Sequence, residues 1–565
     1  MGILLNPDQE NYDKLDPASQ EIMRQTHAFF RSKGKQKIID DYNARVWYQD
    51  FLDFVKDKQV FAGLLTPAGY GGDDSRWDTR RICDFNELLG FYGLSYWYTW
   101  QVSILGLGPI WMGDNEAAKH KAATLLQQGE IFAFGLSEKE HGADIYSSEM
   151  MLHPQADGSY LASGDKYYIG NGNQAAMVST FAKVAGTDDY VFFEVNSQHE
   201  KYECVKNTVS SQNFVAQYRL SDYPITEANI LSRGSKAWDC ALNTINVGKY
   251  NLGWASIGIC THAFYEALNH ASKRRLFDHY VTDFPHIRGL FVDAFCRLTA
   301  MKLFALRASD YMRSASETDR RYLLFNPMVK MKVTTEGEHV INHLWDVIAA
   351  KGFEKDQYFS VAAVDIRALP KLEGTVHVNM ALIIKFMPNY FFNPAEFADV
   401  PERCDASNDT FLFHQGPAKA LGKIQFHDFN KAYNSVDLPN VNVFKRQIEV
   451  FKEFMLAATP DKEQAKDIDF LLNVGELFTL VVYGQLVIES AAIQGLSDDL
   501  LDQIFDVLVR DFSKFALILF SKPSATQTQI ELFRRMLDKA VVDSERFDRV
   551  WESEVYTLRD TYQLE

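Results

Sequence analysis

Cysteine is scarce in this chain, and its spacing argues against two common architectures. Six cysteines are scattered among 565 residues without a C-x-x-C pair, a pattern that indicates reduced core thiols and disfavours a disulfide framework or a zinc site. Positive charge is also in deficit, because 58 Lys and Arg stand against 75 Asp and Glu, for a formal net charge of −17. A surface of that sign disfavours nucleic acid and anionic membranes as partners. We therefore expect a cytoplasmic protein that binds no nucleic acid.

Motifs for several other functions are also lacking. The chain contains no G-x-G-x-x-G, no phosphate-loop lysine motif and no H-E-x-x-H, which leaves most nucleotide-dependent and zinc-hydrolase classes without support. Its start has no basic segment followed by an apolar run, so we expect no signal peptide. The most apolar late segment, 478–493, is interrupted by Gln485 and Glu489, and we expect a buried helix there rather than a membrane span.

A small acidic cluster invites a metal-site interpretation that its spacing does not support. Glu138, Glu140 and His141 lie close together in the sequence, but they match no known metal-ligand spacing. A solvated loop is the better interpretation, and no metal is predicted.

Hydrophobic periodicity divides the chain into four regions. The apolar fraction of 47% supports globular folding, and 565 residues predict three or four packed units. Helical spacing dominates except in one region, where the period changes towards two. The predicted fold is mainly α with a central β-domain: an N-terminal helical domain (1–130), a β-domain (131–235), a helical bundle (236–392) and a C-terminal helical extension (393–565).

The pattern also predicts individual elements. Helices are expected at 46–55, 80–89, 116–127, 238–276, 288–312, 443–457, 468–493, 500–519 and 530–542, and strands at 150–152, 160–162, 180–184, 190–195 and 217–220. Glycines between residues 106 and 113 predict a turn.

Two loop segments organise the predicted β-domain. Residues 134–145 read FGLSEKEHGADI, and residues 164–172 read GDKYYIGNG. Loops held between strands offer backbone N–H groups and a hydroxyl to a flat polar ligand. Further phrases occupy residues 63–72 (GLLTPAGYGG), 222–231 (DYPITEANIL), 273–277 (KRRLF), 347–353 (VIAAKGF) and 372–379 (LEGTVHVN).

The order and spacing of these phrases resemble the acyl-CoA dehydrogenase family over roughly residues 20–392. With the C-terminal extension, the chain is similar to the long forms, the very-long-chain dehydrogenases and acyl-CoA oxidases. The resemblance implies a helical domain, a β-barrel-like middle domain and a four-helix bundle. It also implies FAD-dependent α,β-dehydrogenation of an acyl thioester on CoA or acyl-carrier protein, with an acceptor such as an electron-transfer flavoprotein. A homodimer or homotetramer is implied as well.

Glu373 is the predicted catalytic residue. Removing two hydrogens from an acyl thioester requires a base at the α-carbon, and a carboxylate among apolar neighbours such as Leu369, Pro370 and Leu372 suits that task. The same segment also reads as an ordinary helix start with Thr375 as N-cap. The order of the family phrases favours the catalytic interpretation.

The resemblance assigns further roles residue by residue. It implies that FAD is contacted by Phe134, Leu136, Ser137, Tyr168, Ile169, Gly170, Arg274, Phe277, Thr375 and His377. It implies that the substrate is contacted by Ala143, Asn246, Lys249 and Gly374. Arg274 and Phe277 would reach the cofactor of a neighbouring subunit, although Arg274 also fits a solvated charge at a helix end.

Departures from the family pattern concentrate on the cofactor. Ala143 and Gly170 replace hydroxyl residues, Ala349 and Ala350 replace paired glycines, and Pro285 and Asp346 stand where glutamines are expected. Added methyl groups hinder close backbone approach to a pyrophosphate, and an aspartate repels one. Two alternatives stay open: the C-terminal extension is also consistent with an acyl-CoA oxidase that uses oxygen, and these departures are consistent with a non-catalytic relative that binds acyl groups or a partner protein.

Overall fold

The chain forms two compact units, each built from segments that are distant in the sequence. In a computed structural model, residues 2–417 and 421–565 are described. The sheet unit comprises Gln9–Asn251, Cys404–Lys419 and Leu564–Glu565, and the bundle unit comprises Met1–Asp8, Leu252–Arg403 and Ala420–Gln563. Helix α8 (Gly234–Lys273) begins in the sheet unit and ends in the bundle unit.

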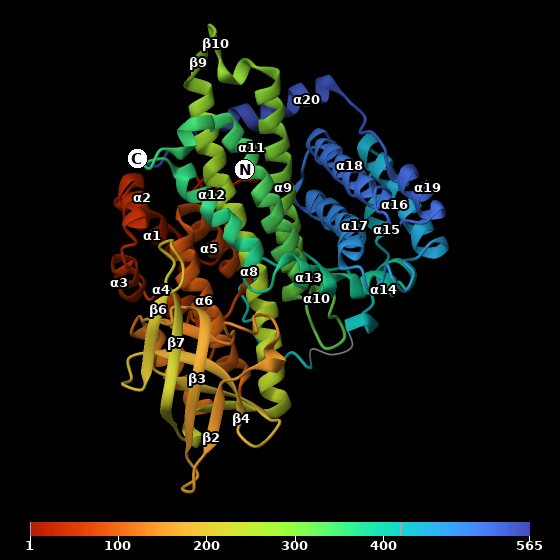
Figure 1. The fold of residues 1–565 in the computed structure, drawn as a ribbon. Helices are drawn as coiled ribbons and strands as arrows, with labels where there is room; N and C mark the ends of the chain where they lie inside the picture. The colour runs from red at the N-terminus through yellow and green to blue at the C-terminus, as the bar shows by residue number, and fades with distance from the viewer. Residues whose placement is uncertain (1, 418–420) are drawn as a thin grey trace. The chain divides into compact units, whose positions relative to one another are not determined.

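Helices precede the strands of the sheet unit (Figure 1). They are α1 (Pro17–Lys33), α2 (Lys35–Ala44), α3 (Gln49–Asp57), α4 (Val60–Leu65), α5 (Thr79–Tyr92), α6 (Leu94–Met112) and α7 (Glu116–Gln127). Local chemistry fixes the start of α1, because Asp16 accepts a hydrogen bond from the Ser19 amide and Pro17 stands at the first helical position. The predicted helix at 116–127 coincides with α7, whereas α3 begins three residues later than predicted.

Helix α6 corrects the predicted turn at 106–113. The helix continues through all but the last of these residues, and every residue in it is buried. A Cβ on Gly106 would lie 2.6 Å from the backbone nitrogen of Ala133, and one on Gly108 would lie 2.3 Å from the Thr244 hydroxyl. These glycines therefore permit close contact with a strand and with α8, and they do not form a turn.

The sheet has the strand order β6-β7-β3-β2-β4-β5-β8, with β1 paired to β4. Its strands are β1 (Phe132–Gly135), β2 (Met151–Pro154), β3 (Tyr160–Gly170), β4 (Met177–Val184), β5 (Tyr190–Val195), β6 (Tyr202–Asn207), β7 (Val215–Ile225) and β8 (Ile230–Arg233). β4 pairs in parallel with β1 and β2, and the other pairs are antiparallel. In Figure 1 these strands run from orange to yellow. The central sheet is confirmed and β5 matches its prediction, but β6 and β8 were not predicted.

The bundle unit continues α8 with a hairpin and a set of helices. These elements are β9 (Arg275–Leu276), β10 (His279–Tyr280), α9 (Pro285–Arg313), α10 (Tyr322–Met328), a π-helical turn (Val329–Val333), α11 (Thr334–Ile348), α12 (Tyr358–Ala368), α13 (Val376–Ile383) and α14 (Met387–Phe392). The predicted helix at 238–276 is too long at its C-terminal end, because the chain leaves α8 at Lys273 to form the hairpin.

The C-terminal helices pack on the bundle through α17 and α18. They are α15 (Asn430–Asn434), α16 (Pro439–Ala457), α17 (Ile468–Gln494), α18 (Asp498–Phe520), α19 (Gln527–Met536) and α20 (Ser544–Val550). Arg297 on α9 pairs with Asp511 on α18 at 2.8 Å and with Glu336 on α11 at 2.7 Å, and all three side chains are largely buried. The extension is therefore integrated into the charged core of this unit. The last predicted helix ends six residues early, at Met536.

Helix α17 is the one helix among the described residues that is long and apolar enough to cross a membrane by length and composition. Its most apolar 18-residue window is 83% buried inside the protein. Burial of this extent is typical of a core helix.

Candidate functional site

The loop that carries Glu373 has an unusual backbone. It follows α12 and a 3₁₀ turn (Leu369–Lys371), and it ends where the Thr375 hydroxyl caps α13 by accepting a hydrogen bond from the Val378 amide. Glu373 has φ +53° and Gly374 has φ +89°, so two successive residues adopt left-handed conformations. A non-glycine residue with φ in this range stores strain of about 1–2 kcal/mol, and such strain concentrates at functional sites.

Glu373 itself is half-buried, and its Oε2 atom is inaccessible to solvent. The neighbouring predicted residues are less enclosed: Gly374 is half-buried, and Thr375 and His377 are exposed. The structure confirms Thr375 as an N-cap and places Glu373 two residues before it in a strained loop, while the catalytic role of Glu373 stays a prediction.

Two buried side chains hold the Glu373 loop, and sequence reasoning missed both. The ammonium of Lys330 donates to the carbonyl oxygens of Pro370 at 2.7 Å and Gly374 at 2.5 Å. The amide of Asn379 donates to the carbonyl oxygens of Gly374 at 3.0 Å and Thr375 at 2.9 Å. Lys330 lies 43 residues before Glu373, so no local signal in the sequence connects the two.

In the sheet unit, the two predicted loop segments lie side by side. The Ser137 hydroxyl donates to the Tyr167 carbonyl oxygen at 2.8 Å, and the Tyr167 amide donates to the Ser137 carbonyl oxygen at 2.9 Å. Next to this link, the Tyr168 side chain is 62% exposed and its backbone has φ +63°. The half-buried Ser137 is thus bonded to the backbone of the residue that directly precedes the exposed Tyr168.

The other predicted cofactor residues of the sheet unit are more enclosed. Phe134 is half-buried, while Leu136 and Ile169 are buried. Gly170 is buried too, and a Cβ there would lie 2.7 Å from the ring of Tyr98 on α6. At Gly170, therefore, only the backbone has room to face a ligand.

A buried ion pair supports the loop at 134–145 from within. Lys166 is fully buried and donates to Glu138 Oε1 at 2.7 Å and to the Leu136 carbonyl oxygen at 3.0 Å. Burial lowers the pKa of Lys166 to about 8, against the opposing effect of the Glu138 carboxylate. Burial favours a higher pKa for Glu138, but the ammonium of Lys166 and hydrogen bonds from Ser148 and Glu149 hold it below its ordinary value. Both partners are therefore charged near pH 7.

This pair corrects the prediction of a solvated loop at Glu138, which is only 7% exposed. Glu138, His141 and Glu149 place one potential metal-ligand atom each within 4.8 Å of one another. Glu138 is already neutralised by Lys166, and His141 Nε2 lies 3.3 Å from Glu149.

The predicted substrate residues of the sheet unit lie in different environments. On α8, Asn246 is half-buried and Lys249 is buried, whereas Ala143 is exposed in its loop. Next to Lys249, the Gly248 carbonyl oxygen accepts a hydrogen bond from the Gln101 amide at 2.9 Å. This contact fixes α6 against the same turn of α8.

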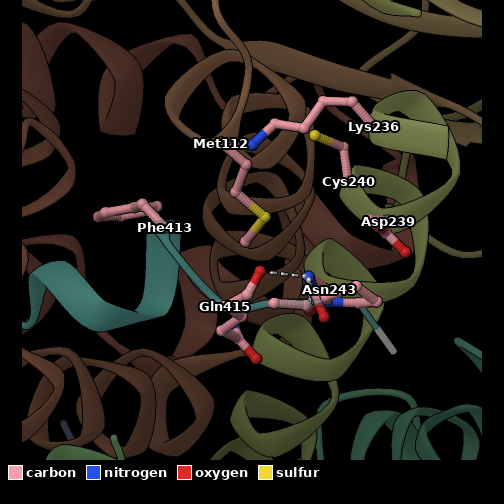
Figure 2. A pocket seen from close by; sticks show the side chains of 9 residues that line it. Met112, Lys236, Asp239, Cys240, Asn243, Phe413 and Gln415 are labelled. Carbon is pink, nitrogen blue, oxygen red and sulfur yellow. Dashed lines mark hydrogen bonds between the residues drawn. The ribbon is translucent and has the colours of Figure 1, made fainter. Parts of the chain in front are cut away.

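A small cavity opens near the start of α8 (Figure 2). Its volume is about 170 Å³, and it is lined by Met112, Lys236, Asp239, Cys240, Asn243, Phe413, Gln415, Gly416 and Pro417. The Asn243 amide donates to the carbonyl oxygens of Gln415 and Gly416 at 3.4 Å. Burial raises the pKa of the Cys240 thiol to about 11, so this cysteine is protonated near pH 7. The cavity is far smaller than an acyl-CoA molecule.

The wall formed by residues 413–417 belongs to a longer strap, residues 404–417. Asn408 Oδ1 accepts hydrogen bonds from the Trp77 amide at 2.7 Å and the Ala68 amide at 3.1 Å. Asp409 Oδ2 accepts one from the Thr79 amide at 2.7 Å. The strap therefore fixes the loop between α4 and α5.

The predicted residues Arg274 and Phe277 lie at an exposed hairpin. Phe277 and Asp278 have φ +52° and +63°, as expected for the two central residues of a type I′ turn between β9 and β10. The Phe277 side chain is 88% exposed, and Arg274 is exposed as well.

The phrase at 347–353 keeps a glycine-like backbone without its first glycine. Ala349 has φ +58° and ψ −140°, a conformation that is normally restricted to glycine. Ala349, Ala350 and Asp346 are exposed. Pro285, another departure from the family pattern, occupies the first turn of α9, where proline is favoured.

Comparisons with known proteins agree with this architecture. Residues 236–387 match the family model described as acyl-CoA dehydrogenase, C-terminal domain. The chain is 21% identical over 373 residues to a 3-(aryl)acrylate reductase of Clostridium sporogenes, covering 64% of this chain and 97% of the reductase. It is 23% identical over 351 residues to a short-chain-specific acyl-CoA dehydrogenase of Megasphaera elsdenii, covering 58% of this chain and 88% of that dehydrogenase.

Among solved structures, an acyl-CoA dehydrogenase from Bacillus anthracis complexed with FAD superposes with a TM-score of 0.73. The sequence identity is 16%, and the match covers 98% of both chains, including the C-terminal helices. Residues 236–387 therefore match the acyl-CoA dehydrogenase C-terminal domain, and the whole chain has the fold of an acyl-CoA dehydrogenase with additional C-terminal helices.

Proposed function

We propose that this protein is an FAD-dependent enzyme that removes hydrogen from the α- and β-carbons of an acyl thioester, with Glu373 as the base at the α-carbon. The observation that carries the proposal is the Glu373 loop, with its left-handed backbone, an enclosed carboxylate oxygen and buried donors that fix the residues on either side. A positioned carboxylate is a suitable acceptor for a proton on carbon next to a carbonyl group.

The residues present fit a flavin ring at the two linked loops of the sheet unit. Ser137 is bonded there to the backbone of Tyr167, which directly precedes the exposed Tyr168, and the buried Lys166 holds the carbonyl of Leu136. In the bundle unit, Ala349 keeps the backbone conformation of the replaced glycine. When bound, FAD would supply the hydride acceptor that no side chain provides.

The test compares Glu373→Gln with wild type. We expect the variant to retain bound yellow flavin and to lose turnover of acyl-CoA substrates by about 10²–10⁴-fold. Glu354→Gln is the matched control, because Glu354 is an exposed carboxylate of the same unit. Full turnover by flavin-loaded Glu373→Gln would refute the role of Glu373.

The electron acceptor distinguishes the dehydrogenase from the alternative oxidase. The extra C-terminal helices motivate the oxidase, since that long form is also found among acyl-CoA oxidases. Turnover that produces hydrogen peroxide without an added acceptor would favour the oxidase, whereas turnover that depends on an electron-transfer flavoprotein or a dye would favour the dehydrogenase.

A specific observation also favours a non-catalytic relative as the second candidate. The exposed methyl groups of Ala349 and Ala350 and the exposed carboxylate of Asp346 lie where the family pattern places a pyrophosphate. Protein that is purified without flavin and cannot be reconstituted with FAD would support this candidate and contradict the enzyme.

The exposed hairpin supports a homodimer or homotetramer as part of the proposal. Phe277 presents an aromatic ring at the hairpin tip and Arg274 a charge at its base. Light scattering of wild type and Phe277→Ser tests this point: we expect an oligomer and weaker flavin retention in the variant. A monomeric wild type would contradict it.

A further inference from the structure

Lys330 is a fully buried lysine in an irregular part of a helix. It lies in the π-helical turn Val329–Val333 between α10 and α11. A π-turn inside a helix is less stable than a regular turn and often accompanies a functional site. Burying an ammonium group also costs free energy unless strong acceptors surround it. Two unfavourable features therefore coincide at one residue.

The acceptors of this ammonium lie on both sides of Glu373. Its Nζ atom donates to the carbonyl oxygens of Pro370, three residues before Glu373, and Gly374, one residue after it. One ammonium group thus links the 3₁₀ turn before Glu373 to the residue after it. Hydrogen bonds from a charged donor are about twice as strong as neutral ones, so this contact resists relaxation of the left-handed backbone.

A second donor completes the clamp. Asn379 is fully buried on α13, and its amide reaches Gly374 and Thr375. The Gly374 carbonyl oxygen therefore accepts from both Lys330 and Asn379, which come from different helices. With two donors on one carbonyl, the peptide group between Gly374 and Thr375 has a defined orientation.

Lys332 provides an internal comparison. It lies in the same π-turn and is also buried, at 3% exposure, but its ammonium pairs with the Glu336 carboxylate. Lys332 thus joins the ion-pair network of α9 and α11, whereas Lys330 binds the Glu373 loop.

We propose that Lys330 is a positioning residue that holds the Glu373 carboxylate in its working orientation by fixing the carbonyls of Pro370 and Gly374. The catalytic part of this inference rests on the proposed role of Glu373, whereas the clamp itself does not.

The first experiment measures backbone amide exchange at residues 369–379 in the full-length protein. In Lys330→Met, which preserves the apolar stem and removes the donors, we expect roughly tenfold or faster exchange there, since a hydrogen bond to a charged group is lost at each end of the loop. Lys332→Met should leave exchange at 369–379 unchanged. Equal exchange in the two variants would overturn the proposal, whether or not the protein is an enzyme.

The second experiment uses steady-state kinetics on flavin-loaded protein. We expect Lys330→Met to lower kcat by about 100-fold, the usual effect of a 1 Å displacement of a catalytic group, with KM little changed. Lys330→Gln, which restores neutral N–H donors, should recover part of that loss and also serves if Lys330→Met does not fold. A rise in KM with unchanged kcat, or the same loss in Lys332→Met, would overturn the positioning role. An inactive wild type would refute the proposed function, and amide exchange would still decide whether the clamp exists.

Discussion

Replacing Ala349 with glycine should stabilise this protein. Substituting glycine in a helix or strand normally destabilises, but Ala349 occupies φ +58° and ψ −140° at the end of α11. A non-glycine residue in that region is strained by about 1–3 kcal/mol. Glycine removes this strain and adds about 0.4–1 kcal/mol of conformational entropy to the unfolded chain. Subtracting the entropy effect from the strain removed predicts that the free energy of unfolding rises by about 1 kcal/mol.

Ala350→Gly is a matched control with the same chemical change one residue later. Ala350 is not among the residues with positive φ, so glycine relieves no strain there. The free energy of unfolding of this variant should therefore fall by about 0.4–1 kcal/mol. The assay is urea-induced unfolding followed by tryptophan fluorescence, with the midpoints of the three proteins compared. If Ala349→Gly unfolds at the same or lower urea than wild type, the strain at Ala349 is not real.

The same pair of variants also bears on the proposed cofactor. If the Ala349 methyl group hinders approach of a pyrophosphate, Ala349→Gly should bind FAD more tightly. Each kcal/mol of binding free energy gained lowers the Kd about fivefold. Equilibrium titration with FAD, followed by flavin fluorescence, measures this. Weaker FAD binding by Ala349→Gly would contradict the interpretation of this loop as part of the cofactor site.

Three further experiments test the sheet unit. Gly108→Ala should lower the free energy of unfolding by about 1–3 kcal/mol, because the added methyl group overlaps α8. Gly63→Ala, whose methyl group would make only ordinary contact at 3.5 Å, should raise the free energy of unfolding by up to about 1 kcal/mol. Equal denaturant midpoints for the two variants would contradict this expectation. Between pH 8 and 10.5 the free energy of unfolding of the wild type should rise by up to about 3 kcal/mol relative to that of Lys166→Met. The reason is that Lys166 has a pKa of about 8 in the folded protein, so it loses its proton at a lower pH there than in the unfolded chain. Parallel curves of stability against pH for the two proteins would contradict this expectation. Asn408→Ala should speed amide exchange at Ala68 and Trp77, and unchanged exchange would exclude its proposed hold on that loop.

The bounds predicted from the sequence for α7 and β5 agree with the structure. Prediction from the sequence failed where one residue type is common in two different kinds of structure. The glycines of α6 look like turn formers, but they are contact points whose role appears only once β1 and α8 are in place. Strand β6 was missed because five of its six residues are exposed, which leaves no alternation to detect.

Only those parts of the candidate site that lie within one short stretch of sequence could be proposed from the sequence. Glu373 and Thr375 belong to one short phrase, so their order was visible in the sequence. The roles of Lys330 and Lys166 were not visible in the sequence. A lysine normally predicts a solvated surface, and the acceptors of these two lysines lie 28 to 44 residues away. Buried charge depends on tertiary neighbours, and these are absent from local sequence patterns.

The strap at 404–417 changes what a shortened protein would contain. A chain that stopped at residue 392 would match the length of the basic family module, yet it would leave the Trp77 and Thr79 amides without the side-chain acceptors that Asn408 and Asp409 provide. Residues 564–565 belong to the sheet unit as well, where the Glu565 carbonyl accepts from the Lys35 amide. The late third of this chain is therefore not a removable appendage, since residues 408, 409 and 565 supply acceptors to backbone amides near the start of the sheet unit.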